Sequence, residues 1–215
     1  MPCSDIIVIV MAAGQSSRFG SDKRVAKLGN GETLLSSTLR TIQKTFSNSR
    51  VVIKPEDNAQ SLGLIPTNHI IISQRSHLGL GYSISDAFRQ LCSDESVHHF
   101  RAAAVWLADL PCNVLTKTAT PDSIVQPLHQ GNPGHPVVFG RKFWSELALL
   151  ENDRGASPVI KKHSKRVIYV SLNDPGVCTD VDYPDDLTKS LKNTRSAQAP
   201  YKNTTKITLK AKTDF

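Results

Sequence analysis

A short segment of small and basic residues has the chemistry needed to bind the phosphates of a nucleotide. It spans residues 12–23, reads AAGQSSRFGSDK, and directly follows an apolar run at residues 6–10. Backbone N–H groups next to small side chains can donate to phosphate oxygens, and Arg18 and Lys23 add positive charge. The spacing matches neither G-x-x-x-x-G-K-[ST] nor G-x-G-x-x-G. The alternative is a surface loop whose charges are incidental.

Three acidic residues at two places in the chain are candidates for binding a divalent cation. Asp109 follows an apolar run at residues 102–107, and Asp180 and Asp182 follow a turn at residues 173–176. Mg²⁺ is commonly held by one or two carboxylates while it bridges to substrate phosphates, as nucleotidyl transfer requires. Asp180 and Asp182 are two residues apart, so only one of them faces the site if the segment is extended. Taken singly, each acid is more simply explained as a solvated side chain or a helix cap.

The apolar pattern predicts alternating strands and helices that would position these groups. Strands are predicted at residues 6–10, 51–53, 69–72, 102–107, 123–125, 136–139 and 167–170, and helices at 34–46, 81–91, 143–150 and 158–163. This alternation predicts an α/β fold with a doubly wound, mostly parallel sheet flanked by helices. In such sheets ligands bind beyond the carboxyl ends of the strands, which is where the segment 12–23 and Asp109 are expected.

The net charge of +7, from 26 basic and 19 acidic residues among 215, is concentrated at one end of the chain. Residues 188–215 hold seven basic residues and one acidic residue, whereas residues 1–187 are close to neutral. We therefore expect one domain at 1–187 and a basic C-terminal tail at 188–215, containing the end of the last helix and then a flexible segment or an edge strand. A solvated tail is the simpler interpretation, and contact with nucleic acid or an acidic partner is the alternative.

Neither a membrane nor an oxidising compartment is indicated by the sequence. No run approaches the ~20 apolar residues that span a bilayer, and the first apolar run is too short for a signal peptide. The four cysteines are far apart and lack the spacing of a metal site. We expect a cytoplasmic protein with reduced thiols.

Six segments resemble, in the same order, motifs of the nucleotidyltransferase family that handles the molybdenum cofactor. The match extends over most of residues 6–187, although Tyr183 stands where threonine is more usual and residues 113–121 are shorter than the corresponding family segment. The six segments are residues 12–23 (AAGQSSRFGSDK), 79–84 (GLGYSI), 108–111 (ADLP), 134–139 (GHPVVF), 153–156 (DRGA) and 180–187 (DVDYPDDL).

This resemblance implies a Rossmann-like nucleotidyltransferase fold and a specific reaction. CMP would pass from CTP to the terminal phosphate of molybdopterin with release of pyrophosphate, in the presence of Mg²⁺, and a molybdenum enzyme would receive the product. The cytidylyl branch is favoured by Ala13, where guanylyl-transferring relatives tend to carry glycine, and by the segment Gly134-His135-Pro136-Val137. The nucleophile is an anionic phosphate, so no general base is required.

The resemblance also implies a role for individual residues. Catalysis would involve Lys23, Arg18 and Asp109, and the substrate side would include His135 and Arg154. Nucleotide contacts would come from Ala12, Ala13, Gly14, Arg18, Lys23, Gly81 and Ser83, and metal contacts from Asp109, Asp180 and Asp182.

Two other classes of function stay open from the sequence. The chain could be a nucleotidyltransferase that uses GTP or another phosphorylated acceptor, such as a sugar phosphate. It could also be a non-catalytic chaperone that holds a nucleotide or cofactor. Turnover of a nucleotide separates the enzymes from the chaperone, and the choice of acceptor separates the two enzymes.

Overall fold

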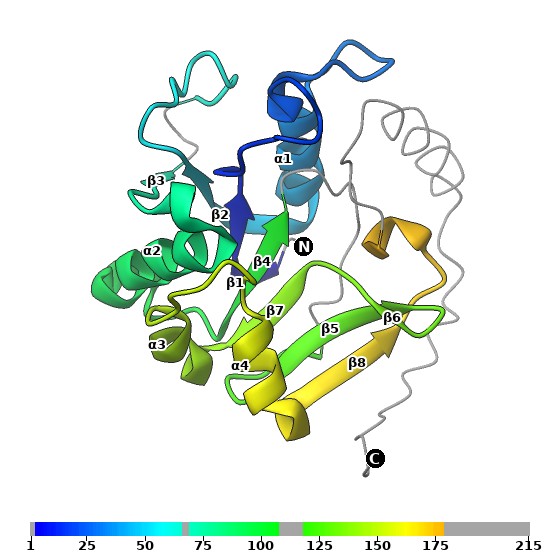
Figure 1. Cartoon of the computed structure of the whole chain (residues 1–215). Coiled ribbons are helices and arrows are strands. Elements are labelled where there is room, and N and C mark those ends of the chain that lie inside the picture. Colours follow the sequence, from blue (N-terminus) through cyan, green and yellow to red (C-terminus); the bar gives the residue numbers. More distant parts are fainter. Residues whose placement is uncertain (1–2, 66–68, 108–117, 179–215) are drawn as a thin grey trace.

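The computed structural model describes residues 3–65, 69–107 and 118–178, which build one eight-stranded sheet with helices on both faces (Figure 1). The order of the strands is β3-β2-β1-β4-β7-β5-β6, and β8 pairs with β5. The strands are β1 Cys3–Met11, β2 Phe46–Ile53, β3 Ile70–Ile72, β4 Ala102–Leu107, β5 Ile124–His129, β6 Asn132–Pro133, β7 Val137–Gly140 and β8 Val167–Ser171.

Most strands of this sheet run in one direction. β1 pairs in parallel with β2 and β4, and β2 pairs in parallel with β3. β7 is antiparallel to both β4 and β5, and β8 is parallel to β5. It follows that β5 and β8 point the same way as β1, so the carboxyl ends of β1 to β5 and β8 share one edge of the sheet. The prediction of a mostly parallel sheet is confirmed.

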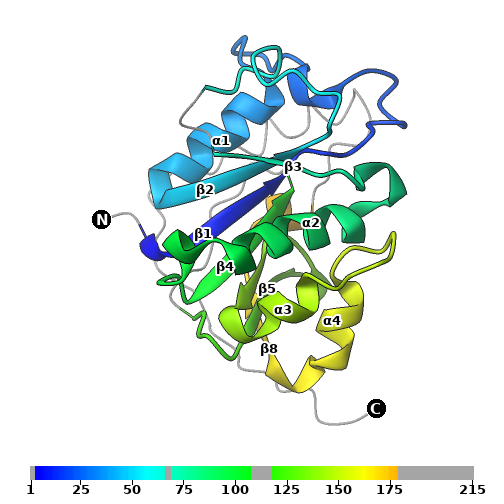
Figure 2. The same ribbon diagram turned by 90° about the vertical axis from the view of Figure 1, so that its left-hand side faces the viewer.

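The helices cover the two faces of the sheet because the apolar side chains of β1 alternate between two cores. Ile7, Ile9 and Met11 enter a core shared with α2, whereas Ile6, Val8 and Val10 enter a core shared with α1. Figure 2 shows α1 on one face and α2, α3 and α4 on the other. The helices are α1 Leu34–Thr45, α2 Leu80–Ser93, α3 Trp144–Leu147 and α4 Ser157–Lys162. The doubly wound arrangement is therefore confirmed.

The boundary between α1 and β2 differs from the prediction. A helix over 34–46 and a strand over 51–53 were expected, but α1 ends at Thr45 and β2 begins at Phe46. The buried ring of Phe46 packs edge-on against Trp106, with 6.1 Å between the ring centroids. Residues 48–50 pair with β1 through their backbone, which does not require apolar side chains. The apolar pattern therefore detects only the consecutive apolar residues 51–53 at the end of this strand.

The helix predicted at 143–150 is shorter than expected. α3 spans Trp144–Leu147, and the following N–H groups of Leu149 and Leu150 bond three residues back. The carbonyl of Ala148 accepts hydrogen bonds from the Ser85 hydroxyl at 2.6 Å and from Arg89 Nε at 2.9 Å. Side chains of α2 thus take a carbonyl that a longer helix would have used. The strand predicted at 102–107 has the predicted bounds, and the other predicted elements are present with shifted bounds.

Several predictions fall on residues that lie outside the described part of the chain. These are the candidate metal ligands Asp109, Asp180 and Asp182, and the basic tail at 188–215 with the end of the last helix. Within the described residues, no helix is both long and apolar enough to cross a membrane.

Candidate functional site

The segment 12–23, which we name the basic loop, folds back on itself after β1. Ser16 and Gly20 adopt positive φ angles of 51° and 78°, and the Phe19 N–H donates to the Ser16 carbonyl at 3.0 Å. The buried ring of Phe19 packs against Leu34 and anchors the outer part of the loop. The Lys23 N–H then donates to Ser16 Oγ at 3.4 Å. The loop therefore returns Lys23 to the end of the strand that it left.

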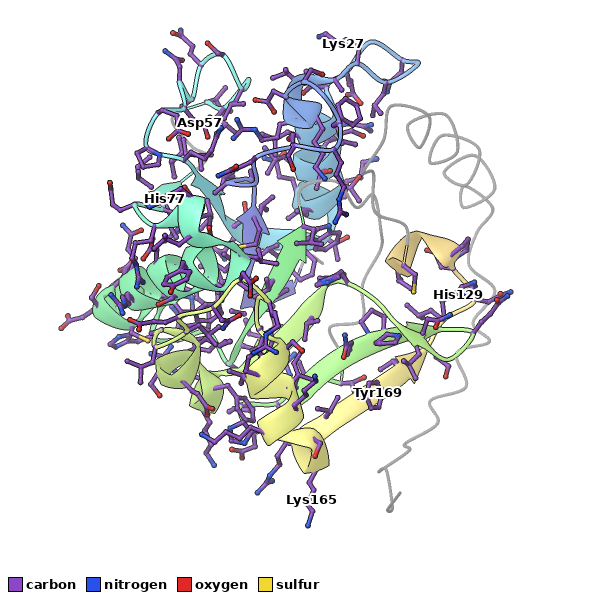
Figure 3. All side chains as sticks on the ribbon, viewed as in Figure 1. Lys27, Asp57, His77, His129, Lys165 and Tyr169 are labelled. Carbon is purple, nitrogen blue, oxygen red and sulfur yellow. The ribbon has the colours of Figure 1, made fainter. Side chains whose placement is uncertain are left out.

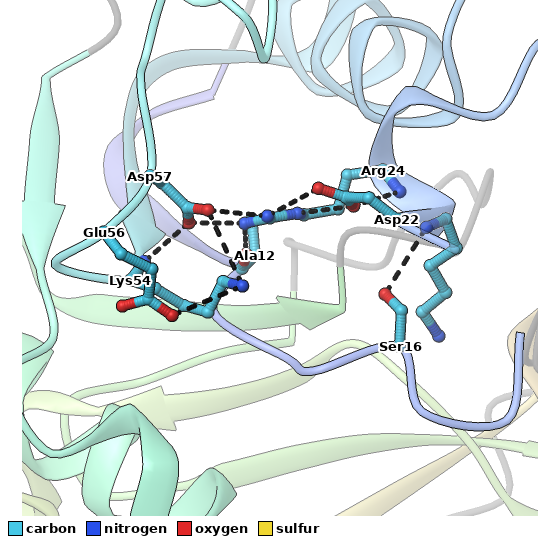
Figure 4. Close-up of polar contacts among 8 residues, drawn as sticks. Ala12, Ser16, Asp22, Arg24, Lys54, Glu56 and Asp57 are labelled. Carbon is cyan, nitrogen blue, oxygen red and sulfur yellow. Dashed lines mark hydrogen bonds and ion pairs between the residues drawn. The ribbon is translucent and has the colours of Figure 1, made fainter. Parts of the chain in front are cut away.

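Arg24 fixes the two ends of the basic loop to each other (Figure 4). Its side chain is 5% exposed, and its Nη1 donates to the Ala12 carbonyl at 2.7 Å. Nε and Nη2 donate to the two oxygens of Asp22 at 2.8 and 2.7 Å. Nη1 and Nη2 also donate to the two oxygens of Asp57, beyond the end of β2, at 2.5 and 2.7 Å. One guanidinium therefore holds three segments together beneath the loop.

The buried charge of Arg24 is balanced by two carboxylates that stay ionised. Hydrogen bonds from the Arg24 side chain lower the pKa of Asp22, against a partial burial that raises it. Burial alone would raise the pKa of Asp57, but hydrogen bonds from Arg24 and from the Lys54 N–H bring it below its usual range. The pKa of Arg24 is raised, since these hydrogen bonds outweigh the effect of its burial. Both carboxylate oxygens of Asp22 thus accept hydrogen bonds from Arg24, which argues against Asp22 as a metal ligand.

The turn before α2 lies across from the basic loop. A short 3-10 helix at Ser76–Leu78 leads to Gly79, whose φ of 129° is a conformation that other residues rarely adopt. A Cβ atom on Gly79 would lie 2.7 Å from the Cα of Asp153. Glycine is therefore required here both by the backbone angle and by the neighbouring loop between α3 and α4.

A pocket of about 400 Å³ separates the basic loop from this turn. It opens at the carboxyl edge of the sheet, because Met11 of β1 and Leu107 of β4 form part of its lining. On one wall, backbone groups and Lys23 can bind an anion. On the other wall, apolar side chains can contact a flat ring. Among the residues that the structure describes, the lining consists of Met11, Ala12, Ala13, Gly14, Gln15, Ser16, Lys23, Arg24, Ser76, His77, Leu78, Gly79, Leu80, Ser83 and Leu107.

Five of the predicted nucleotide-binding residues meet at this pocket, and two do not. Those that line it are Ala12, Ala13, Gly14, Lys23 and Ser83. Arg18 is exposed on the basic loop and is not part of the lining. Gly81 faces the loop between α3 and α4 instead of the pocket, since a Cβ atom on it would lie 2.4 Å from the Asn152 carbonyl oxygen. The observed role of Gly81 is to allow close packing of α2 on the loop between α3 and α4.

The two predicted substrate-side residues lie on other segments. The N–H of His135 donates to the Val177 carbonyl at 2.8 Å, just before β7. Arg154 is exposed, and its N–H donates to Asn152 Oδ1 at 2.7 Å in the loop between α3 and α4. Neither residue lines the pocket.

The described residues contain no group of three or more His, Cys, Asp or Glu side chains that could hold a metal ion. The candidate acids come shortly after described residues at the carboxyl edge of the sheet. Asp109 is two residues beyond Leu107, which lines the pocket, and Asp180 is two residues beyond Cys178. The metal site thus stays a prediction from the sequence.

Arg24 and its partner Asp57 were not predicted from the sequence. The string Asp22-Lys23-Arg24 was a visible signal of charge, but no spacing pattern links it to a residue after another strand. His77, Leu78 and Leu80 were also missed as lining residues. They lie on both sides of Gly79, where the segment 79–84 that resembles a family motif begins.

A comparison with protein families identifies the chain. Residues 8–167 match the family described as the MobA-like NTP transferase domain. The chain belongs to this family. Family membership therefore makes this pocket the candidate active site of a nucleotidyltransferase. Among curated proteins, no sequence matches the chain.

Solved structures of the family type share the fold. Rv0371c from Mycobacterium tuberculosis H37Rv aligns with a TM-score of 0.69 at 20% identity over 89% of this chain and 100% of that one. Another structure of Rv0371c is a complex with manganese. Molybdopterin-guanine dinucleotide biosynthesis protein A from Archaeoglobus fulgidus aligns with a TM-score of 0.60 at 18% identity, over 88% and 99% of the two chains.

The name of a third protein with this fold includes a different acceptor. The inositol-1-phosphate CTP transferase from T. maritima aligns with a TM-score of 0.60 at 14% identity, over 91% of this chain and 97% of that one. Identities this low establish the fold alone. The Rossmann-like nucleotidyltransferase fold expected from the sequence is thus confirmed, and substrate identity is a separate question.

Proposed function

We propose that this protein transfers CMP from CTP to the terminal phosphate of molybdopterin, releasing pyrophosphate in a reaction that requires a divalent cation. The observation that carries the proposal is the pocket in which the basic loop faces the first turn of α2 at the carboxyl edge of β1 and β4. Membership of the MobA-like NTP transferase family supports the reaction class.

The basic loop would bind the triphosphate. Backbone from Ala12 to Ser16 lines the pocket, and Lys23 lies on the same wall. Amide donors and one ammonium group together match the oxygens and charge of a polyphosphate. Arg18 is exposed beyond the lining, where it can meet the outer phosphates of a nucleotide that extends from the pocket.

The reaction requires positioning and charge stabilisation more than proton transfer. The attacking phosphate is already an anion, so the protein need not supply a general base. Lys23 would stabilise charge that develops on the transferred phosphoryl group, a type of contribution whose loss typically costs about 3 kcal/mol of the barrier. The fixed backbone around Arg24 keeps Lys23 in place before the substrate arrives.

A divalent cation would neutralise phosphate charge and orient the α-phosphate. Asp109, Asp180 and Asp182 are the candidate ligands by sequence, and Asp109 follows a pocket-lining residue by two positions. The manganese complex of Rv0371c supports a divalent cation of this kind. Mg²⁺ is our choice because it usually keeps several waters and binds through one or two carboxylates and substrate phosphates.

Cytosine is favoured over guanine by Ala13. This residue is 4% exposed and lines the pocket at a position where the guanylyl-transferring relatives tend to carry glycine. A methyl group at that point leaves less room for a purine. The Archaeoglobus relative, named for guanine dinucleotide synthesis, supports GTP as the second candidate nucleotide. The T. maritima relative, named for inositol 1-phosphate, supports a polyol phosphate as the second candidate acceptor.

A pyrophosphate-release assay tests this proposal. The full chain is incubated with CTP, UTP, GTP or ATP, each with and without molybdopterin, and in parallel with a sugar phosphate or a polyol phosphate. We expect release with CTP only when molybdopterin is present. Release with GTP alone would move the protein to the guanylyl branch, and release with another acceptor would change the substrate. No release under any condition would contradict the proposal of an enzyme.

A further inference from the structure

The pocket wall opposite the basic loop carries two apolar side chains at its rim. Leu78 is 47% exposed and Leu80 is 37% exposed, and few other large apolar side chains among the described residues are as open to solvent. Apolar side chains gathered at a pocket rim favour a ligand that covers them. Lys23 attracts the phosphates on the other wall, so the leucines face the base and ribose end of a bound nucleotide.

The loop between α3 and α4 packs directly behind this wall. A Cβ atom on Gly79 would lie 2.7 Å from the Cα of Asp153, and one on Gly81 would lie 2.4 Å from the Asn152 carbonyl oxygen. The preceding segment is tied to α2 through the Ala148 carbonyl, which accepts from Ser85 and Arg89. The loop therefore forms a firm support for the first turn of α2.

Gly155 in this loop makes room for the side chain of Leu80. Its φ is 62°, and a Cβ atom there would lie 2.9 Å from Cδ2 of Leu80 and 3.3 Å from Cγ. Leu80 thus rests between the pocket and a glycine that leaves it space. If that space were filled, the end of the leucine side chain would have to move away from the loop, and the pocket lies on that side.

We propose that Leu80 is a specificity-determining residue for the base of the nucleotide, and that Gly155 is a positioning residue that sets where the Leu80 side chain lies. This inference rests on the proposed function. A flat ring packs against Leu80. The depth of the space in front of the Leu80 side chain, which we name the slot, decides between a single pyrimidine ring and the larger purine. Two residues from distant parts of the chain thereby control one dimension of the pocket.

Substitutions at the two positions should change nucleotide preference in opposite ways. Gly155→Ala pushes Leu80 into the slot, so CTP affinity should fall about tenfold and GTP affinity should fall further. Leu80→Ala removes the apolar contact and deepens the slot. CTP affinity should again fall about tenfold, but GTP affinity should fall less, so the preference moves toward the purine.

The double variant tests whether Gly155→Ala acts through the Leu80 side chain or by disturbing the fold in general. With the leucine trimmed, the methyl group of Gly155→Ala has no side chain to displace, so Gly155→Ala/Leu80→Ala should bind nucleotides like Leu80→Ala alone. Gly131→Ala is the matched control. Gly131 has a φ of 85°, and a Cβ atom on it would meet nothing within 4 Å, so the substitution brings similar backbone strain without a neighbour to push. Its nucleotide affinities should equal those of the unsubstituted protein.

Isothermal titration of the full chain with CTP, UTP, GTP and ATP in the presence of Mg²⁺ measures these affinities. Unchanged affinities in Gly155→Ala and Leu80→Ala, or losses that simply add in the double variant, would overturn the inference while leaving the proposed function intact. A protein that binds no nucleotide at all would contradict the proposed function and this inference with it. If circular dichroism finds Gly155→Ala unfolded, Leu80→Phe replaces it, and it should weaken GTP more than CTP; the reverse order would contradict the inference.

Discussion

Arg24 binds Asp57 through two hydrogen bonds of 2.5 and 2.7 Å, although the two residues are 33 positions apart in the chain. The Arg24 side chain is 5% exposed and that of Asp57 is 7% exposed, so the pair is shielded from water. Asp22 and the Ala12 carbonyl complete the contacts of the guanidinium. The basic loop is therefore held by charge-assisted hydrogen bonds beneath the pocket, while the face toward the pocket stays open to a ligand.

Removing the guanidinium should destabilise the fold. Arg24→Ala leaves the buried Asp57 carboxylate without its main partner, and the free energy of unfolding should fall by about 3–5 kcal/mol. Chemical denaturation followed by circular dichroism measures this loss. Arg40→Ala is the matched control, because its ion pair with Glu32 is largely exposed, with side chains 48% and 35% accessible. That variant should lose no more than about 1 kcal/mol, and an equal loss in both variants would contradict the assignment.

The same cluster should make stability depend on pH in the acid range. The pKa of Asp57 and that of Asp22 are lower in the folded chain than in the unfolded chain, where the pKa of an aspartate is about 3.9. Their contribution is therefore fully present above that pH and is lost as the pH falls toward the folded values. Unfolding curves between pH 2 and pH 7 should show this decline. Asp57→Asn should lower stability at neutral pH and flatten the decline; an unchanged profile would argue against the cluster.

Lys23 should matter for turnover far more than for folding. Lys23→Ala removes the ammonium group from the pocket wall, so kcat should fall about 10²–10³-fold with little change in the thermal midpoint. Steady-state kinetics with CTP and acceptor provide the measurement. Lys27→Ala is the control, since Lys27 is exposed on the outer loop before α1 (Figure 3). Comparable activity in the two variants would remove Lys23 from the mechanism.

Gly81 should be a packing position. Gly81→Ala places a methyl group 2.4 Å from the Asn152 carbonyl oxygen, and such overpacking typically costs about 1–3 kcal/mol of stability. Gly14→Ala is the comparison, because a Cβ there meets nothing within 4 Å. Denaturation midpoints should therefore fall for Gly81→Ala and hardly change for Gly14→Ala. Equal midpoints would mean that the loop between α3 and α4 yields without cost.

Local patterns in the sequence were enough to predict the mostly parallel sheet and the basic loop that forms one wall of the pocket. The apolar run at residues 6–10 identified the central strand, because a strand covered by helices on both faces needs apolar residues at consecutive positions. The basic loop follows that strand directly, so its place at the carboxyl edge followed from the strand. Ala13 and Lys23 were found in this way.

Contacts between distant segments could not be predicted in the same way. The pairing of Arg24 with Asp57 depends on the neighbouring positions of β1 and β2, and no spacing in the chain encodes it. Gly81 lies in a segment that resembles a nucleotide motif, yet a Cβ atom on it would meet the carbonyl of Asn152, which belongs to the loop between α3 and α4. The polar residues 47–50 of β2 were not predicted as strand, because residues 48–50 pair with β1 through the backbone alone.

In the proposed reaction, the α-phosphate of CTP is transferred to the acceptor as part of CMP. The direct measurement uses CTP labelled at the α-phosphorus, incubated with molybdopterin, Mg²⁺ and the full chain, with Asp109→Ala and Lys27→Ala in parallel. We expect the label in the acceptor product with the unsubstituted protein and with Lys27→Ala, and we expect Asp109→Ala to abolish it. Label that stays in CTP, or that appears only as free CMP, would contradict the proposed transfer.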